Sequence, residues 1–131
     1  KLGLPVVGIS VSLHSPYSFD CFYQQAGPSE FLNLIKNATL ILTSSFHGMA
    51  LSINFRKDFI VLKHGTRMSR MESLLANFNL KNRLVHNIDT LDDLVNYNIH
   101  VNYSDCENTI SEKVDYSRKW LVKHILNQLD E

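Results

Sequence analysis

A strand, turn and helix pattern over residues 39–51 constrains the fold of this chain more than any other segment. Residues 39–43 (TLILT) are apolar or β-branched, and two serines and the sequence Phe46-His47-Gly48 follow them. The next run is apolar on every face: Met49, Ala50, Leu51, Ile53 and Phe55. A strand buried on both sides that leads at once into a buried helix is typical of a parallel sheet. The pattern therefore predicts an α/β fold.

The turn after this strand is a candidate ligand site, because open α/β sheets bind ligands at the carboxyl ends of their strands. His47 lies in the turn. Gly48 allows backbone to approach closely, and the free N–H groups of the next helical turn favour an anion. A hydrogen-bonded structural histidine is the alternative, and the sequence leaves both interpretations open.

Length and composition bound the class of protein. The 131 residues suffice for one compact domain with a core but hardly for two. Thirteen basic and thirteen acidic residues give a formal net charge of zero, which argues against a nucleic-acid-binding surface. No apolar run is long enough for a membrane span. Cys21 and Cys106 lack metal-ligand spacing, so we expect reduced structural thiols in a cytosolic protein.

The remaining chain is typical of alternating strands and helices. Further strands are expected at 5–12, 21–25, 59–62 and 83–85, and a loop at 14–20. Helices are expected from Pro28 to near Asn37, over 71–78, from Thr90 to Val95, and from about 104–109 onward. We expect Ser69 and Glu72 to cap the second of these. We expect the last helix to bury Ile110, Val114, Leu121 and Ile125.

A basic segment at residues 63–70 is expected beside His47. The carboxyl ends of two parallel strands open on the same side of a sheet, so the segment after strand 59–62 shares the edge of His47. Arg56 and Lys57 belong to the opposite edge. The segment contains four potential cations: Lys63, His64, Arg67 and Arg70. An anion-binding role and a solvated loop both remain open.

Several kinds of active site are absent from the sequence. It contains no phosphate-binding G-x-x-x-x-G-K-[ST], no G-x-G-x-x-G, no H-E-x-x-H and no G-x-S-x-G. The six histidines show no i, i+4 pairing, so we expect no metal site.

From Gly27 to Leu84 the chain resembles the polysaccharide pyruvyl transferase family. The resemblance rests on GPSEFLNLIKNA at 27–38, the strand that follows, and SSFHG at 44–48. It continues through FIV at 59–61, SRM at 69–71 and LL at 74–75, and it closes with residues 80–84.

The resemblance implies a glycosyltransferase-B-like architecture, in which two Rossmann-like halves face a cleft. Residues 1–131 would then be a single Rossmann-like domain, a parallel sheet flanked by helices, and the carboxyl-terminal half of a longer chain. The chain begins without Met at Lys1, in a stretch typical of a helix end, and this also indicates a fragment that lacks its amino-terminal domain.

The resemblance also implies an activity. Family members transfer a pyruvyl group from phosphoenolpyruvate to two hydroxyls of a sugar, which yields a cyclic ketal and phosphate. The implied setting is bacterial exopolysaccharide biosynthesis, in the cytoplasm or at the inner face of the membrane. The acceptor would be a saccharide, free or lipid-linked. Phosphoenolpyruvate would be the donor, with no separate cofactor and no metal.

Members of the family use an Arg-x-His arrangement, and this pattern assigns roles to residues. The histidine corresponds to His47, which would be the general acid. The arginine position is Ser45 here, so other cations must replace it. The substrate-binding set is Ser44, Ser45, Gly48, Lys63, Arg67 and Arg70.

Two other functions remain open. A sugar-nucleotide-dependent glycosyltransferase would use the same strand ends, and a non-catalytic ligand-binding domain could retain the fold without the chemistry. The sequence does not identify the acceptor sugar, the ketal linkage or the oligomeric state. We expect the isolated chain to be inactive, because half of the cleft would be missing.

Overall fold

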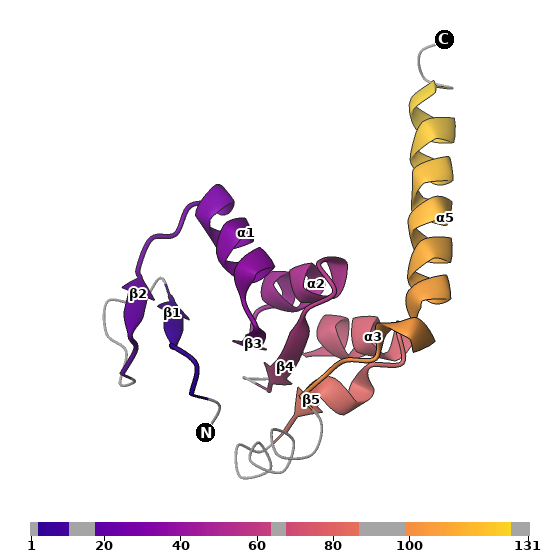
Figure 1. Ribbon diagram of the computed structural model, residues 1–131. Helices are drawn as coiled ribbons and strands as arrows, with labels where there is room; N and C mark the ends of the chain where they lie inside the picture. Colours follow the sequence, from indigo (N-terminus) through magenta and orange to yellow (C-terminus); the bar gives the residue numbers. More distant parts are fainter. Residues whose placement is uncertain (1–2, 11–17, 64–67, 87–98, 127–131) are drawn as a thin grey trace.

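The computed structural model describes residues 3–10, 18–63, 68–86 and 99–126, and it alternates short parallel strands with helices (Figure 1). The strands are β1 (Val7–Ile9), β2 (Cys21–Tyr23), β3 (Leu40–Thr43), β4 (Asp58–Leu62) and β5 (Leu84–Val85). The α-helices are α1 (Pro28–Asn37), α2 (Phe46–Asn54), α3 (Ser69–Asn77) and α5 (Glu107–Leu126). Two 3₁₀ turns, η1 (Lys81–Arg83) and η3 (Tyr103–Asp105), precede β5 and α5.

Every strand pair in the described residues is parallel. One sheet has the order β3-β4-β5, and a separate sheet pairs β1 with β2. Leu40 lies beside Asp58, and Leu62 lies beside Val85, so the three strands of the larger sheet end at a common edge. The predicted α/β class is confirmed, and the sheets are compatible with a Rossmann-like domain. The two-domain, glycosyltransferase-B-like architecture stays a prediction.

The core lies between the larger sheet and α1, α2 and α3. Phe59 and Val61 of the central strand are fully buried, as are Met49 of α2 and Leu75 of α3. Alternation along a strand sends every second side chain to the same face, so Ile41, Phe59 and Val61 all point at the helices. The predicted strand, turn and helix at residues 39–55 is therefore confirmed as the centre of the fold.

The predicted start of α1 is also confirmed. Pro28 occupies the first turn, where its missing N–H costs nothing. The Glu30 carboxylate accepts a hydrogen bond from the N–H of Gly27 at 2.9 Å. The acidic side chain thus satisfies a donor at the positive end of the helix dipole.

Two predictions about buried strands are wrong. The first strand spans only Val7–Ile9, and Val7 and Ile9 are exposed while Gly8 alone is buried. A Cβ on Gly8 would lie 2.7 Å from the Phe19 ring, so this glycine allows the ring to cover the strand. Strand β3 is not buried on both sides, because Leu42 is 51% exposed on the face away from the helices. Within the described residues each of these strands has a neighbouring strand on one side only, so its side chains lack the lateral packing that a central strand receives from two neighbours.

The predicted capping box of α3 is wrong as well. Met68 is the N-cap, it is in the helical region, and no side chain caps the helix. The predicted stop is confirmed, because Asn79 adopts the left-handed conformation with φ of 61°. The predicted short strand at 83–85 is confirmed as the edge strand β5.

Helix α5 departs most from expectation. It extends away from the rest of the structure (Figure 1). Ile110 at its base is buried, but Val114, Leu121 and Ile125 are each at least half exposed. The periodicity that predicted a buried face is present, but within the described residues no element covers it beyond the base.

Some predictions lie outside the described residues. These are the helix from Thr90 to Val95 and most of the loop at 14–20. Cys21 and Cys106 are both free thiols, as expected, and Cys21 is exposed whereas Cys106 is buried. In the part of the chain that the structure describes, no helix has the length and apolar character to cross a membrane.

Candidate functional site

The turn between β3 and α2 is held by its own polar groups. The N–H of Ser45 donates to Thr43 Oγ1 at 3.0 Å, and Ser45 Oγ accepts from the N–H of Gly48 at 3.5 Å. Ser45 is in the extended region and is the N-cap of α2. A serine at this position satisfies one of the donors that a helix start leaves open. Ser45 thus has a structural role that the sequence did not predict.

Gly48 is required by packing rather than by its backbone angles. A Cβ at this position would overlap Thr43 Oγ1 and would lie 3.2 Å from Thr43 Cβ. The expected close approach of backbone is therefore confirmed: the first turn of α2 lies directly against the end of β3. Ser52 Oγ, one turn later, donates to the Gly48 carbonyl at 2.7 Å and is fully buried.

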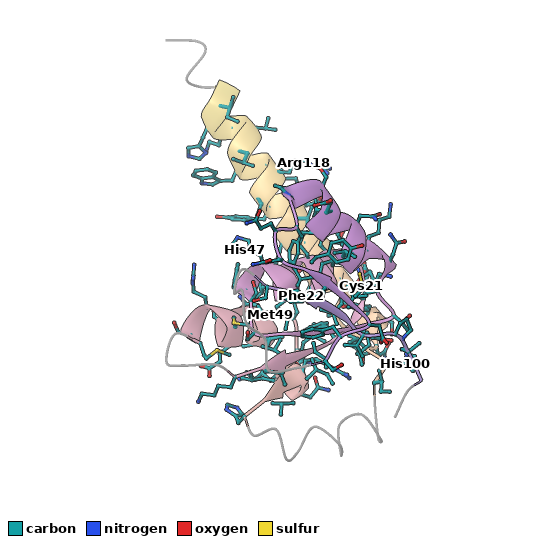
Figure 2. All side chains as sticks on the ribbon, turned by 90° about the vertical axis from the view of Figure 1, so that its left-hand side faces the viewer. Cys21, Phe22, His47, Met49, His100 and Arg118 are labelled. Atoms are coloured by element: carbon teal, nitrogen blue, oxygen red, sulfur yellow. The ribbon has the colours of Figure 1, made fainter. Side chains whose placement is uncertain are left out.

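His47 lies on the exposed side of this first turn (Figure 2). Its ring meets the ring of Phe46 edge-on, with centroids 6.0 Å apart. Within the described residues no hydrogen bond holds the imidazole. A structural histidine would be buried and bonded, so the geometry favours the ligand-binding interpretation of His47 over the structural one.

Arg70 reaches the same turn from α3. Its guanidinium carbon lies 5.3 Å from the centroid of the Phe46 ring, within the range of a cation–π contact. Ser69, Ser73 and Asn77 lie at intervals of four residues along α3, so they share one face. Together with Phe46, Arg70 and Leu74 they line an open groove of about 370 Å³. The expected approach of a basic side chain to the His47 turn is therefore confirmed for Arg70.

Lys63 lies at the same edge but is held differently. It follows β4, its backbone N–H donates to the Val85 carbonyl at 3.0 Å, and its side chain is exposed. His64 and Arg67 lie outside the described residues, so their predicted roles stay predictions. Ser44 is exposed in the turn, and among the described residues its side chain makes no hydrogen bond.

His86 is a candidate that the sequence reasoning missed. It follows β5 directly and is exposed, and the pairing of Leu62 with Val85 places it beside Lys63. The signal was available, because any polar residue that follows a predicted parallel strand belongs to the ligand-binding edge. The described part of this edge thus contains four basic or titratable side chains, those of His47, Lys63, Arg70 and His86. The acidic residue closest to any of them in the sequence is Glu72, two residues after Arg70 in α3.

The groups with shifted pKa values lie at the other edge of the sheet. Arg56 pairs with Glu107 through two hydrogen bonds of 2.8 and 2.7 Å, and this pair lowers the pKa of the Glu107 carboxyl. Burial raises the pKa of the Tyr103 hydroxyl, which donates to the Lys57 carbonyl at 2.6 Å. Burial also lowers the pKa of the Arg83 guanidinium, which donates to two backbone carbonyls.

These contacts tie the base of α5 to the end of α2 and the start of β4, so their role is structural. Arg56 and Lys57 lie at this opposite edge, as expected. Shifted pKa values often mark functional sites, but ion-pair networks also produce them. Here they do not point to the His47 turn.

The arrangement around His47 suits the binding of a small anion. It offers an exposed imidazole, an exposed guanidinium and the amino-terminal end of a nine-residue helix. An imidazole in that position can also donate a proton to a bound molecule. Among the described residues, no three His, Cys, Asp or Glu side chains are grouped closely enough to hold a metal ion.

Comparison with known proteins finds a family match over the segment that contains the His47 turn. The model of the polysaccharide pyruvyl transferase family matches residues 5–66, just under half of the 131 residues. No curated protein and no solved structure matches the chain.

The match contains β1, which the sequence resemblance did not use, and it ends before Arg70. It lies in the amino-terminal part of this chain, so it does not test the assignment to the family's carboxyl-terminal half. Residues 5–66, which include His47 and its turn, are thus similar to the polysaccharide pyruvyl transferase family.

Proposed function

We propose that this chain forms part of an enzyme that transfers the pyruvyl group of phosphoenolpyruvate to two hydroxyls of a saccharide. The observation that carries the proposal is the exposed His47 on the first turn of α2, with the Arg70 guanidinium at the same turn. This reaction needs a general acid beside the anion site that binds phosphoenolpyruvate. The family's transferase character supports the proposal.

The donor would bind through its two acidic groups. Its carboxylate and phosphate would be neutralised by the N-terminus of α2, by Arg70 and by Lys63. Ser45 stands where family members have arginine, and its Oγ caps the helix, so the missing positive charge must come from other elements. Arg70 supplies it from α3. The groove of about 370 Å³ beside Phe46 is within the size range of small-molecule sites.

The chemistry proceeds in two additions. The imidazolium of His47 gives a proton to the methylene carbon of phosphoenolpyruvate, and the cation that develops at the adjacent carbon is attacked by one sugar hydroxyl, which loses its proton. The carbon–oxygen bond to phosphate then breaks, and the second hydroxyl adds to the same carbon and loses its proton in turn. The products are the cyclic ketal and inorganic phosphate. No cofactor is needed, because the donor itself carries the activated group.

The site in this chain is open, and this supports a second domain. His47 and Arg70 are exposed, whereas such chemistry is faster where water is excluded. We propose that an amino-terminal Rossmann-like half, outside this sequence, closes over the same edge of the sheet. This chain would then be the carboxyl-terminal half of a glycosyltransferase-B-like enzyme, and by itself it would bind weakly and turn nothing over.

The direct test measures phosphate release from phosphoenolpyruvate in the longest polypeptide that contains this sequence, with a panel of saccharide acceptors. His47→Ala should lower kcat by roughly 10²–10⁴, the usual contribution of a general acid. Arg70→Ala should mainly raise KM for phosphoenolpyruvate, because it removes a clamp on the ground-state anion. His124→Ala, on exposed α5 and far from the site, is the matched control and should leave both constants unchanged.

The same assay separates the alternatives. Full turnover by His47→Ala would refute the role of the imidazole. Turnover with a uridine or guanosine diphosphate sugar in place of phosphoenolpyruvate would instead indicate a glycosyltransferase. Binding of either donor without turnover would indicate a domain that retained the fold and lost the chemistry.

A further inference from the structure

The exposed face of α5 is the largest apolar feature that the proposed function does not use. Val114, Leu121, Val122 and Ile125 are each 50–56% exposed. Together with Ile110 and Phe78 at the base they line an open groove of about 570 Å³. Exposed apolar surface of this extent is typical of an interaction site.

The stripe is continuous with the core. Ile110, Val114, Leu121 and Ile125 recur at intervals of four, seven and four residues, so they lie on one face of the helix. Ile110 is only 7% exposed and belongs to the core cluster. The stripe therefore begins in the core and continues along the exposed part of α5. A helix of 20 residues is about 30 Å long, so its outer half stands clear of the domain. Figure 1 shows this outer half projecting away from the sheet.

The stripe is symmetric about its own centre, between Ser117 and Arg118. If a second α5 lies antiparallel across that centre, Ile110 faces Ile125 of the second copy, and Val114 faces Leu121 of the second copy. A two-fold interface needs this self-complementary order. Ser117, which is small, lies at the middle, where the two helices come closest. The projecting half of each helix then fills the groove beside Phe78 of the other copy.

Charge favours the antiparallel direction. Asp115 and Arg118 lie on one flank of the stripe close to its centre, and neither makes an ion pair within the described residues. An antiparallel pair brings Arg118 of each copy near Asp115 of the other, which gives two symmetric attractions. In a parallel pair the flank that carries Asp115 and Arg118 would face the opposite flank of the other copy, so Arg118 would not meet Asp115. The antiparallel pair therefore gains two attractions that the parallel pair lacks.

From these observations we propose that α5 is a self-association surface, and that its occupant is the α5 of a second copy of this chain in antiparallel orientation. The proposal goes beyond the catalytic function and does not depend on it. The turn at His47 takes no part in the contact.

The mass of the 131-residue chain in solution tests the proposal. Light scattering behind size exclusion at about 100 µM, far above a micromolar Kd, should give twice the mass of one chain. Leu121→Glu should give a single chain, because it places a carboxylate at the centre of the apolar contact. Tyr116→Glu, on the opposite face and 69% exposed, is the matched control and should remain a dimer. Both positions are exposed in the single chain, so neither substitution should unfold it.

Cysteine pairing tests the direction. In a Cys21→Ser background, a mixture of Val114→Cys and Leu121→Cys chains should form a disulfide-linked dimer, and Val114→Cys alone should not. Asp115→Arg should weaken the dimer at least tenfold, and Asp115→Arg with Arg118→Asp should restore it.

Three outcomes would overturn the proposal. The first is a wild-type chain that remains single at this concentration. The second is a Val114→Cys chain that crosslinks to itself as readily as the mixture does. The third is a chain that remains single and sediments with vesicles of anionic phospholipid, since the stripe would then be a membrane-binding face.

Discussion

Replacing Gly48 by alanine should disturb the turn that holds His47, and the structure gives the size of the effect. The new methyl group would overlap Thr43 Oγ1 and press on Thr43 Cβ at 3.2 Å. Thr43 cannot rotate away freely, because its Oγ1 accepts the N–H of Ser45 at 3.0 Å. Either the first turn of α2 moves off the strand, or that hydrogen bond breaks.

The two effects of the substitution oppose each other. Forcing a methyl group into a packed contact costs about 1–3 kcal/mol. Alanine in place of glycine in a helix returns up to about 1 kcal/mol. The free energy of unfolding should therefore fall by about 1 kcal/mol, within a range of roughly 0–2 kcal/mol. In a Thr43→Ala background the overlapping oxygen is gone, and Gly48→Ala should be neutral or should stabilise by up to about 1 kcal/mol.

Urea unfolding of the four proteins, followed by circular dichroism, measures this coupling. We expect a coupling free energy of about 1–3 kcal/mol between positions 43 and 48. Ala50→Gly, two residues further along α2, measures the free-energy difference between alanine and glycine in this helix and should cost about 1 kcal/mol. If Gly48→Ala costs the same in both backgrounds, to within about 0.5 kcal/mol, the packing explanation of this glycine is refuted.

Three further predictions concern the base of α5. Glu107→Gln should lower stability at neutral pH, because Arg56 holds the pKa of the Glu107 carboxyl below its ordinary value. The lost contribution is present above that ordinary value of about 4.3 and disappears as pH falls, so urea midpoints of the two proteins should converge in acid. Tyr103→Phe should cost about 1–2 kcal/mol in thermal or urea unfolding, because the Lys57 carbonyl, which accepts from the Tyr103 hydroxyl at 2.6 Å, loses its donor; an unchanged midpoint would contradict this. In thiol labelling, Cys21 should react at once and Cys106 only as the base opens, since Cys106 is 1% exposed and burial raises the pKa of its thiol; equal rates would show that the base is open.

The sequence correctly predicted the elements whose signals are local. The apolar run, the two serines and Phe46-His47-Gly48 predicted β3, the turn and α2. Pro28 and Glu30 predicted the start of α1, and Asn79 predicted the end of α3. The rule that parallel strands end at one edge placed Lys63 and Arg70 on the side of His47 and Arg56 on the other. These features depend on backbone geometry and on neighbours a few residues away, so a single segment contains the information.

What the sequence alone determined about this protein is an α/β chain with a histidine at the carboxyl edge of a parallel sheet. Only the tertiary structure decided which apolar faces are covered, and it left α5, β1 and Leu42 exposed despite their periodicity. It also decided that Ser45 caps α2, that Arg70 contacts Phe46, and that His86 lies at the same edge. The physical reason is that a repeat of apolar residues fixes the direction of a face but not its partner. Burial depends on segments far apart in the chain, or on a second molecule, and no local pattern records them.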